Sequence, residues 1–134
     1  MSCLLAGFGP FEMIDMCNAL DIEPVITTTE SSSPQSLASL VEYCYGGIET
    51  LMGAKRHADG HPQPYRAKYF ELGNEEYNAR FVEQAAAMEA KARELGIGNT
   101  IHYINPAGGK FLNATDLAKA EALNMDHLLV AGKK

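Results

Sequence analysis

An amide and two carboxylates follow a short aromatic run near the middle of the chain. The segment from Arg66 to Tyr77 reads R-A-K-Y-F-E-L-G-N-E-E-Y, so Asn74, Glu75 and Glu76 come directly after Gly73. Tyrosine and phenylalanine favour a pleated backbone and glycine often ends such a run, which predicts a strand here. Parallel α/β folds bind ligands at the carboxyl ends of their strands. Asn74 and Glu75 are therefore candidate site residues.

Glu75 is the carboxylate best placed for general acid/base chemistry. Side chains alternate along a strand, so Glu71 shares a side with Glu75 but lies about 13 Å away at roughly 3.3 Å per residue. The paired carboxylates of enzymes that cleave glycosides lie only about 5–9.5 Å apart, which excludes joint action. Glu76 is adjacent to Glu75, so the two side chains should diverge. A simpler interpretation of Glu75, an acid at the positive end of the following helix, stays open.

A second carboxylate would have to come from another strand end. Glu30 follows the β-branched run at Val25–Thr29 and is the nearest candidate by topology. The simpler interpretation of Glu30 is a solvated loop acid.

Other motifs offer weaker alternatives. His57 and His61 stand four apart, as metal ligands on a helix would, but no third ligand accompanies them. We interpret them as part of a polar loop and predict no metal and no cofactor. His102 lies in an apolar run, where it either lines a pocket or forms a hydrogen bond in the core. Gly108-Gly109-Lys110 is typical of a phosphate loop, although the upstream glycine and the following Ser/Thr are missing.

Strands and helices alternate along the chain, and they must position these residues. We predict strands at Val25–Thr29, Arg66–Gly73, Thr100–Ile104 and His127–Val130, and helices at Phe11–Leu20, Ser33–Cys44, Asn78–Leu95 and Thr115–Leu123. Residues 48–65 read as a long connector. This alternation predicts an α/β fold with a parallel sheet, in a single domain spanning residues 1–134.

Composition limits the classes of partner. The formal net charge is −6 and the basic residues are scattered, which argues against a nucleic-acid surface. No apolar run approaches the roughly 20 residues of a membrane helix. No signal-peptide core is visible, so the default expectation is a cytoplasmic protein. Cys3, Cys17 and Cys44 are odd in number and lack metal-type spacing, which favours buried free thiols.

Three segments in order resemble a known family. E-P-V-I-T-T-T-E, L-V-E-Y-C-Y-G and D-G-H-P-Q-P-Y-R-A-K-Y-F-E-L-G-N-E are similar to the α-L-arabinofuranosidases of glycoside hydrolase family 51. The most specific part is H-P-Q-P-Y followed by K-Y-F-E-L-G-N-E, and the resemblance covers roughly residues 11–105. The family belongs to a clan of retaining glycosidases built on (β/α)₈ barrels.

The resemblance implies a role for each residue that matches the motif. Glu75 would be the general acid/base at the end of the fourth barrel strand, and Asn74 would bind the 2-hydroxyl of the sugar. Glu30 would contribute to substrate binding after the third strand. The family's nucleophile is a second glutamate at the end of the seventh strand, and this chain ends at Lys134 before any such strand.

A complete barrel typically needs about 250 residues, so we expect a partial (β/α)₈ barrel of about four parallel strands with helices on the outer face. The predicted function is hydrolysis of terminal α-L-arabinofuranosides, incomplete or inactive in this fragment. The alternative is a non-catalytic carbohydrate-binding or interaction protein, and open barrel edges predict self-association. A third hypothesis, a doubly wound domain binding phosphate near Gly108-Gly109, predicts helices on both faces of the sheet.

Overall fold

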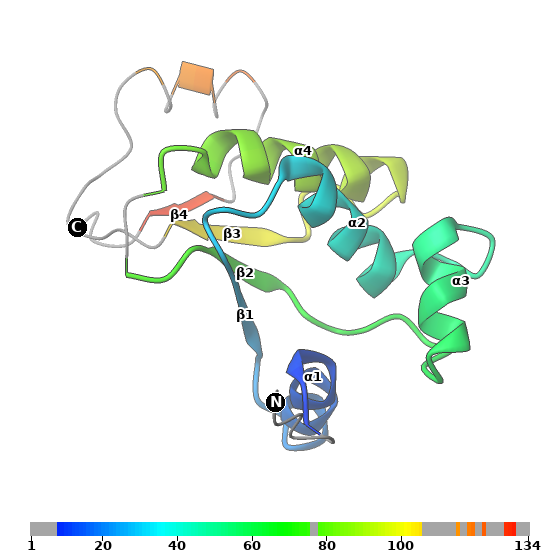
Figure 1. Cartoon of the computed structure of the whole chain (residues 1–134). Coiled ribbons are helices and arrows are strands. Elements are labelled where there is room, and N and C mark those ends of the chain that lie inside the picture. Colours follow the sequence, from blue (N-terminus) through cyan, green and yellow to red (C-terminus); the bar gives the residue numbers. More distant parts are fainter. Residues whose placement is uncertain are drawn as a thin grey trace, which may run out of the picture.

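Four parallel strands form one sheet in chain order, β1-β2-β3-β4 (Figure 1). The computed structural model describes residues 8–75, 78–105, 115, 118–119, 122 and 128–130. The elements are α1 (Pro10–Ala19), β1 (Val25–Thr28), α2 (Pro34–Tyr45), α3 (Leu51–Ala58), β2 (Tyr69–Leu72), α4 (Phe81–Glu94), β3 (His102–Asn105) and β4 (Leu128–Val130). The predicted parallel α/β arrangement with four strands is confirmed.

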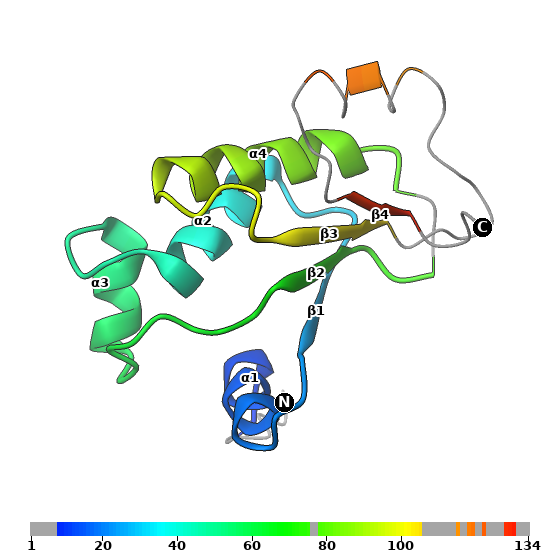
Figure 2. The same ribbon diagram turned by 180° about the vertical axis from the view of Figure 1, so that it is seen from behind.

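Two of the helices that connect successive strands, α2 and α4, lie on the same face of the sheet. Views from opposite sides show α2, between β1 and β2, and α4, between β2 and β3, packed together over that face (Figure 2). A doubly wound sheet reverses its strand order and therefore carries helices on both faces. Here the order does not reverse, so the sheet is wound in one sense, as in a segment of a barrel.

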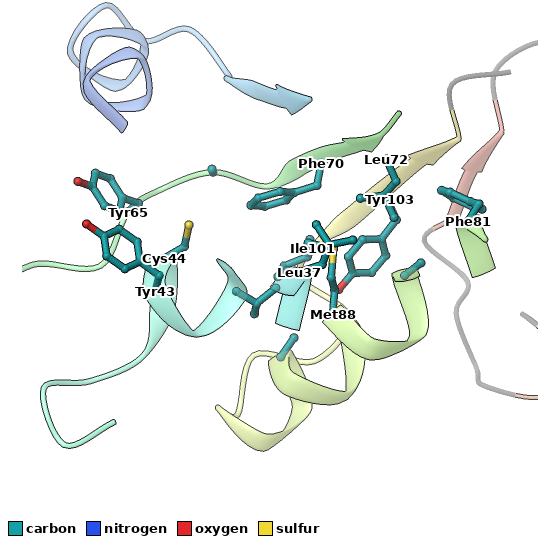
Figure 3. Close-up of a cluster of buried hydrophobic side chains, with 14 of the residues drawn as sticks. Leu37, Tyr43, Cys44, Tyr65, Phe70, Leu72, Phe81, Met88, Ile101 and Tyr103 are labelled. Atoms are coloured by element: carbon teal, nitrogen blue, oxygen red, sulfur yellow. The ribbon is translucent and has the colours of Figure 1, made fainter. Parts of the chain in front are cut away.

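The hydrophobic core fills the space between this sheet face and the two helices. Phe70, Leu72 and Tyr103 point from β2 and β3 toward Leu37 of α2 and Met88 of α4 (Figure 3). All five side chains are buried. Because side chains alternate along a strand, the residues between them face the other way, and that open face is only half-buried.

Residues 48–65 are not the long connector that the sequence predicted, because they contain the helix α3. Thr50 caps its first turn, with the Thr50 hydroxyl accepting from the Gly53 amide at 3.1 Å. The guanidinium of Arg56 is buried and donates to the carbonyls of Tyr43 and Gly46, each at 2.8 Å, where α2 ends. These carbonyls have no partner within α2, so Arg56 satisfies them and fixes α3 against the end of α2.

The other helices agree with prediction to within a few residues. Ser33 caps α2, as predicted, by accepting from the Ser36 amide at 3.1 Å. The helix α4 begins at Phe81 rather than at Asn78. Within the helix predicted for Thr115–Leu123, residues 115, 118, 119 and 122 are helical and the others lie outside the described residues.

Two of the three cysteines lie in the described residues, and both are free thiols. Cys44 is buried, and burial raises the pKa of its thiol to about 12. Cys17 is partly exposed, so the prediction of buried thiols is right for Cys44 and wrong for Cys17. Cys3 lies outside the described residues. Among the helices of the described part, none is long and apolar enough to cross a membrane.

Candidate functional site

The carboxyl ends of β1 and β2 meet at one edge of the sheet. Thr28 pairs with Leu72 at the last position of both strands, and the Gly73 amide donates to the Thr28 carbonyl at 3.0 Å. The loop carrying Glu30 therefore begins beside the loop carrying Asn74 and Glu75. The structure brings the three predicted site residues to the same edge, in neighbouring loops.

The backbone bends sharply where Asn74 and Glu75 lie. The strand β2 ends at Leu72, Gly73 has φ 122°, and Glu75 has φ 55°. Strand alternation therefore does not extend to Glu75, and the prediction that Glu71, Gly73 and Glu75 share one side of a strand is wrong. Glu71 instead accepts a hydrogen bond from the Thr27 hydroxyl at 2.9 Å on the open face of the sheet.

Glu75 occupies a conformation that non-glycine residues rarely adopt. The left-handed region brings Cβ close to the backbone and costs roughly 1–2 kcal/mol. Such outliers gather at functional sites, where the surrounding structure holds them. Asn74 and Glu75 are both exposed at this edge. Glu76 lies outside the described residues.

Glu30 lies in the exposed loop that follows β1. Its carboxylate accepts from the Thr29 hydroxyl at 3.3 Å, and the Thr29 hydroxyl lies 2.9 Å from that of Ser31. The Glu30 carbonyl faces inward and accepts from the Gln84 side chain at 2.9 Å. The backbone of this loop is thus held to α4 while the Glu30 carboxylate stays in solvent.

Sequence reasoning missed two residues at this edge, Asn78 and Gln84. Asn78 is 2% exposed and Gln84 is fully buried, and their side chains are joined by a hydrogen bond of 2.7 Å. A signal was available for Gln84, because its position falls on the buried face of α4 between Phe81 and Met88. An amide in an apolar stripe indicates a buried polar network.

Two polar residues of β3, His102 and Asn105, lie in different environments. Asn105 ends the strand, is fully buried, and neither polar atom of its side chain has a hydrogen-bond partner within the described structure. His102 is half-buried and stacks on Tyr69 with ring centroids 5.0 Å apart, on the open sheet face. The interpretation of His102 as a core residue is therefore wrong, and the interpretation as a pocket-lining residue stays a prediction.

The predicted polar loop holds an aromatic contact. His61 stacks on Tyr65 with ring centroids 3.9 Å apart, and its Nε2 lies 3.3 Å from an Asp15 carboxylate oxygen on α1. His57 is exposed on the helix α3, so the prediction of a polar loop is wrong for His57. In the described ranges, no group of three or more His, Cys, Asp or Glu residues is arranged to hold a metal ion. Gly108, Gly109 and Lys110, the phosphate-loop candidates, lie outside these ranges.

A groove of about 600 Å³ lies at the opposite edge of the sheet, before β1 and β2 begin. Its lining includes Ile22, Glu23, Tyr65 and Lys68. Parallel α/β folds bind ligands at the carboxyl edge, where Asn74 and Glu75 lie. We therefore place the candidate site at the carboxyl edge rather than at this groove.

Comparison with protein families gives a match over most of the chain. The alpha-L-arabinofuranosidase 1 domain matches residues 4–128. Alpha-L-arabinofuranosidase C from Emericella nidulans is 28% identical over 101 residues, which make up 75% of this chain and 20% of that protein. The chain thus spans about a fifth of the length of this curated relative.

Solved structures agree with this match. An α-L-arabinofuranosidase from Thermotoga maritima, solved as an arabinose complex, aligns with a TM-score of 0.55 and 28% identity over 73% of this chain and 22% of its own. AbfB from Bifidobacterium longum, a family 51 α-L-arabinofuranosidase, aligns with a TM-score of 0.60 over 90% of this chain and 25% of its own. At 14% identity the second match supports the fold alone. The predicted fold class, a partial barrel, is confirmed.

Proposed function

The chain belongs to the alpha-L-arabinofuranosidase 1 domain family, and from that premise we propose that it carries the acid/base half of a retaining α-L-arabinofuranosidase site. The observation that carries the proposal is the Gly73-Asn74-Glu75 bend at the carboxyl edge of the sheet. It combines an exposed carboxylate, an exposed amide and a left-handed backbone beside the loop of Glu30.

Glu75 acts twice in this mechanism. In the first step its protonated carboxyl gives a proton to the glycosidic oxygen as the bond to the leaving group breaks. In the second step the same carboxylate removes a proton from water, whose oxygen attacks the anomeric carbon and displaces the carboxylate of the nucleophile. Exposure of Glu75 at the edge is consistent with both steps, since leaving group and water must reach it.

Asn74 and Glu75 are adjacent, so one bound sugar can meet both. Asn74 offers an amide donor and acceptor to the 2-hydroxyl, a contact that strengthens in the transition state of glycoside hydrolysis. Glu30 offers acceptors to other hydroxyls from the neighbouring loop. We propose that Glu30 binds the substrate.

The nucleophile must come from elsewhere. A retaining mechanism needs a second carboxylate about 5 Å from the first. The family resemblance assigns it to a seventh strand, which is not among the four strands that the structure describes. We therefore expect the 134-residue chain to bind an arabinofuranoside but to turn it over poorly or not at all.

The test is a titration of the ¹⁵N-labelled chain with methyl α-L-arabinofuranoside, followed by NMR, with an aryl arabinofuranoside assay in parallel. We expect shifts at the amides of Asn74 and Glu75. Weaker binding of Asn74→Ala, and negligible hydrolysis, should accompany them. Lys55→Ala serves as a control, since Lys55 lies on α3, away from the edge.

Each outcome separates the hypotheses. Binding at the edge without hydrolysis supports the proposed half-site, and it is also what a carbohydrate-binding protein derived from the barrel would show. Glu75→Gln distinguishes these two when the remainder of the barrel, which carries the nucleophile, is supplied. The half-site predicts that this variant then loses hydrolysis, whereas a carbohydrate-binding protein shows no hydrolysis with or without Glu75. Absence of binding, or shifts confined to the groove at the opposite edge, would contradict the proposal.

A further inference from the structure

Two buried amide side chains bridge the loops that carry the candidate site residues. The Asn78 amide nitrogen donates to the Leu72 carbonyl at 2.6 Å and to the Gln84 side-chain oxygen at 2.7 Å. The Gln84 amide nitrogen donates to the carbonyls of Glu30 at 2.9 Å and Ser32 at 2.7 Å. A continuous chain of hydrogen bonds thus runs from the end of β2 to the loop after β1.

This bridge uses the full hydrogen-bonding capacity of its amide nitrogens. Each side-chain amide has two N–H donors, and all four are engaged. The Asn78 oxygen also accepts from the Arg80 amide at 2.9 Å, which fixes the orientation of the Asn78 side chain. Because Asn78 and Gln84 are buried, solvent does not compete for these bonds.

The bridge begins where the sheet stops holding the two loops together. The last backbone hydrogen bond between the ends of β1 and β2 runs from the Gly73 amide to the Thr28 carbonyl. Beyond it, Glu30 and Glu75 diverge from the strands, and their spacing depends on other contacts. Gln84, from the first turn of α4, supplies such contacts to the backbone of Glu30 and Ser32.

We propose that Asn78 and Gln84 are positioning residues, which set the spacing between the loop of Glu30 and the loop of Asn74 and Glu75. The inference rests on the proposed function, since it concerns the geometry of that same sugar site. Neither amide needs to touch the sugar. A displacement of about 1 Å in such a site can cost as much as about a hundredfold in activity, which is why buried supports of this kind matter.

Gln84→Glu is the sharpest variant, because it preserves shape. One side-chain oxygen can still accept from Asn78, but the other faces the carbonyls of Glu30 and Ser32 with no proton when ionised and a single proton when protonated. At least one of the two hydrogen bonds that Gln84 donates is therefore lost. Glu89→Gln is the matched control. Glu89 is buried on the same helix, where its carboxylate accepts from the Arg93 guanidinium, the Tyr103 hydroxyl and the Asn99 amide. These three partners lie outside both loops.

We expect Gln84→Glu to weaken binding of methyl α-L-arabinofuranoside roughly tenfold or more and to shift the amide resonances of Glu30 and Glu75. Both variants should lower the melting temperature, but Glu89→Gln should leave the affinity for the sugar near that of the unmodified chain. The proposal is overturned if Gln84→Glu binds normally, or if Glu89→Gln loses as much affinity at equal stability. Should Gln84→Glu fail to fold, Asn78→Asp makes the same test from the other side, since it keeps the acceptor for Arg80.

Failure of the proposed function can be told apart from failure of this inference. If the unmodified chain binds no arabinofuranoside, the function is wrong, and the spacing is then judged from NMR distance restraints between the two loops. Restraints that change in Gln84→Glu and not in Glu89→Gln uphold the positioning role. Unchanged restraints in both variants overturn it.

Discussion

Glu75 holds a candidate catalytic carboxylate on a backbone that favours glycine. With φ 55°, its left-handed conformation costs roughly 1–2 kcal/mol, whereas glycine adopts this region freely but loses about 0.5–1 kcal/mol in chain entropy. We therefore predict that Glu75→Gly raises the free energy of unfolding by about 0.5–1 kcal/mol. Urea denaturation measures the change.

Glu30→Gly is the matched control for this prediction. Glu30 is an exposed glutamate in the neighbouring loop and has no positive φ, so glycine there should lower stability by about 0.4–1 kcal/mol. Opposite signs for the two variants would show that Glu75 is held at a cost. A loss of stability in Glu75→Gly would mean that Glu75 makes contacts that outweigh its strain.

At the residue scale, the sequence predicted the place of Asn74 and Glu75 but not their geometry. Tyr69 and Phe70 mark the strand and Gly73 marks its end, so the edge on which the polar residues lie follows from local preferences. The left-handed turn at Glu75 does not follow, because it opposes the intrinsic preference of glutamate. The place of Gln84 in the apolar stripe of α4 indicates a buried polar group, but its partners Glu30 and Ser32 are more than fifty positions away in the chain, so the local pattern does not identify them.

At the element scale, α3 depends on a glycine that a helix would ordinarily disfavour. A Cβ at position 53 would overlap the Gly47 carbonyl oxygen and lie 2.6 Å from the Gly46 carbonyl oxygen. Close approach of α3 to the end of α2 therefore requires glycine here. We predict that Gly53→Ala lowers the free energy of unfolding by about 2 kcal/mol, although helix propensity alone predicts a gain of about 1 kcal/mol. Thermal or urea denaturation can measure it.

Ala54→Gly, at the next position, separates packing from propensity. Ala54 is exposed on the same helix, so glycine there should cost only the propensity difference of about 1 kcal/mol. If both variants are destabilised, close packing rather than helix propensity determines the effect of the substitution at Gly53. If Gly53→Ala is more stable than the unmodified chain, the contact with Gly47 is not tight and this interpretation of α3 is wrong.

The elements that could be predicted were those specified by local chemistry. Ser33 and Pro34 begin α2 where the sequence indicates, because a cap and a first-turn proline act within one turn. The helix α3 escaped prediction because it has only eight residues, includes Gly53, and is followed by Gly60 and Pro62. What fixes it is tertiary: buried Arg56 reaches the carbonyls at the end of α2.

At the scale of the whole molecule, the part of the chain that the structure describes leaves one face of the sheet uncovered and its outer edge at β1 unpaired. Within the described residues, β1 pairs with β2 alone, so its other edge has unpaired backbone groups. Leu20, Ile22 and Val25 lead into and begin this strand with more than half of each side chain exposed. An exposed apolar edge strand is a template for pairing with another chain.

We therefore predict that the 134-residue chain self-associates with rising concentration, and that Val25→Lys weakens the association about tenfold or more. A lysine on an edge strand opposes pairing, because its charge would have to be buried or displaced. Sedimentation velocity over a range of concentrations measures the effect. Leu51→Lys is the control, since Leu51 is 82% exposed but lies on α3, away from the edge. Equal weakening by both variants would assign the association to general hydrophobicity rather than to β1, and a chain that stays monomeric throughout would contradict the prediction.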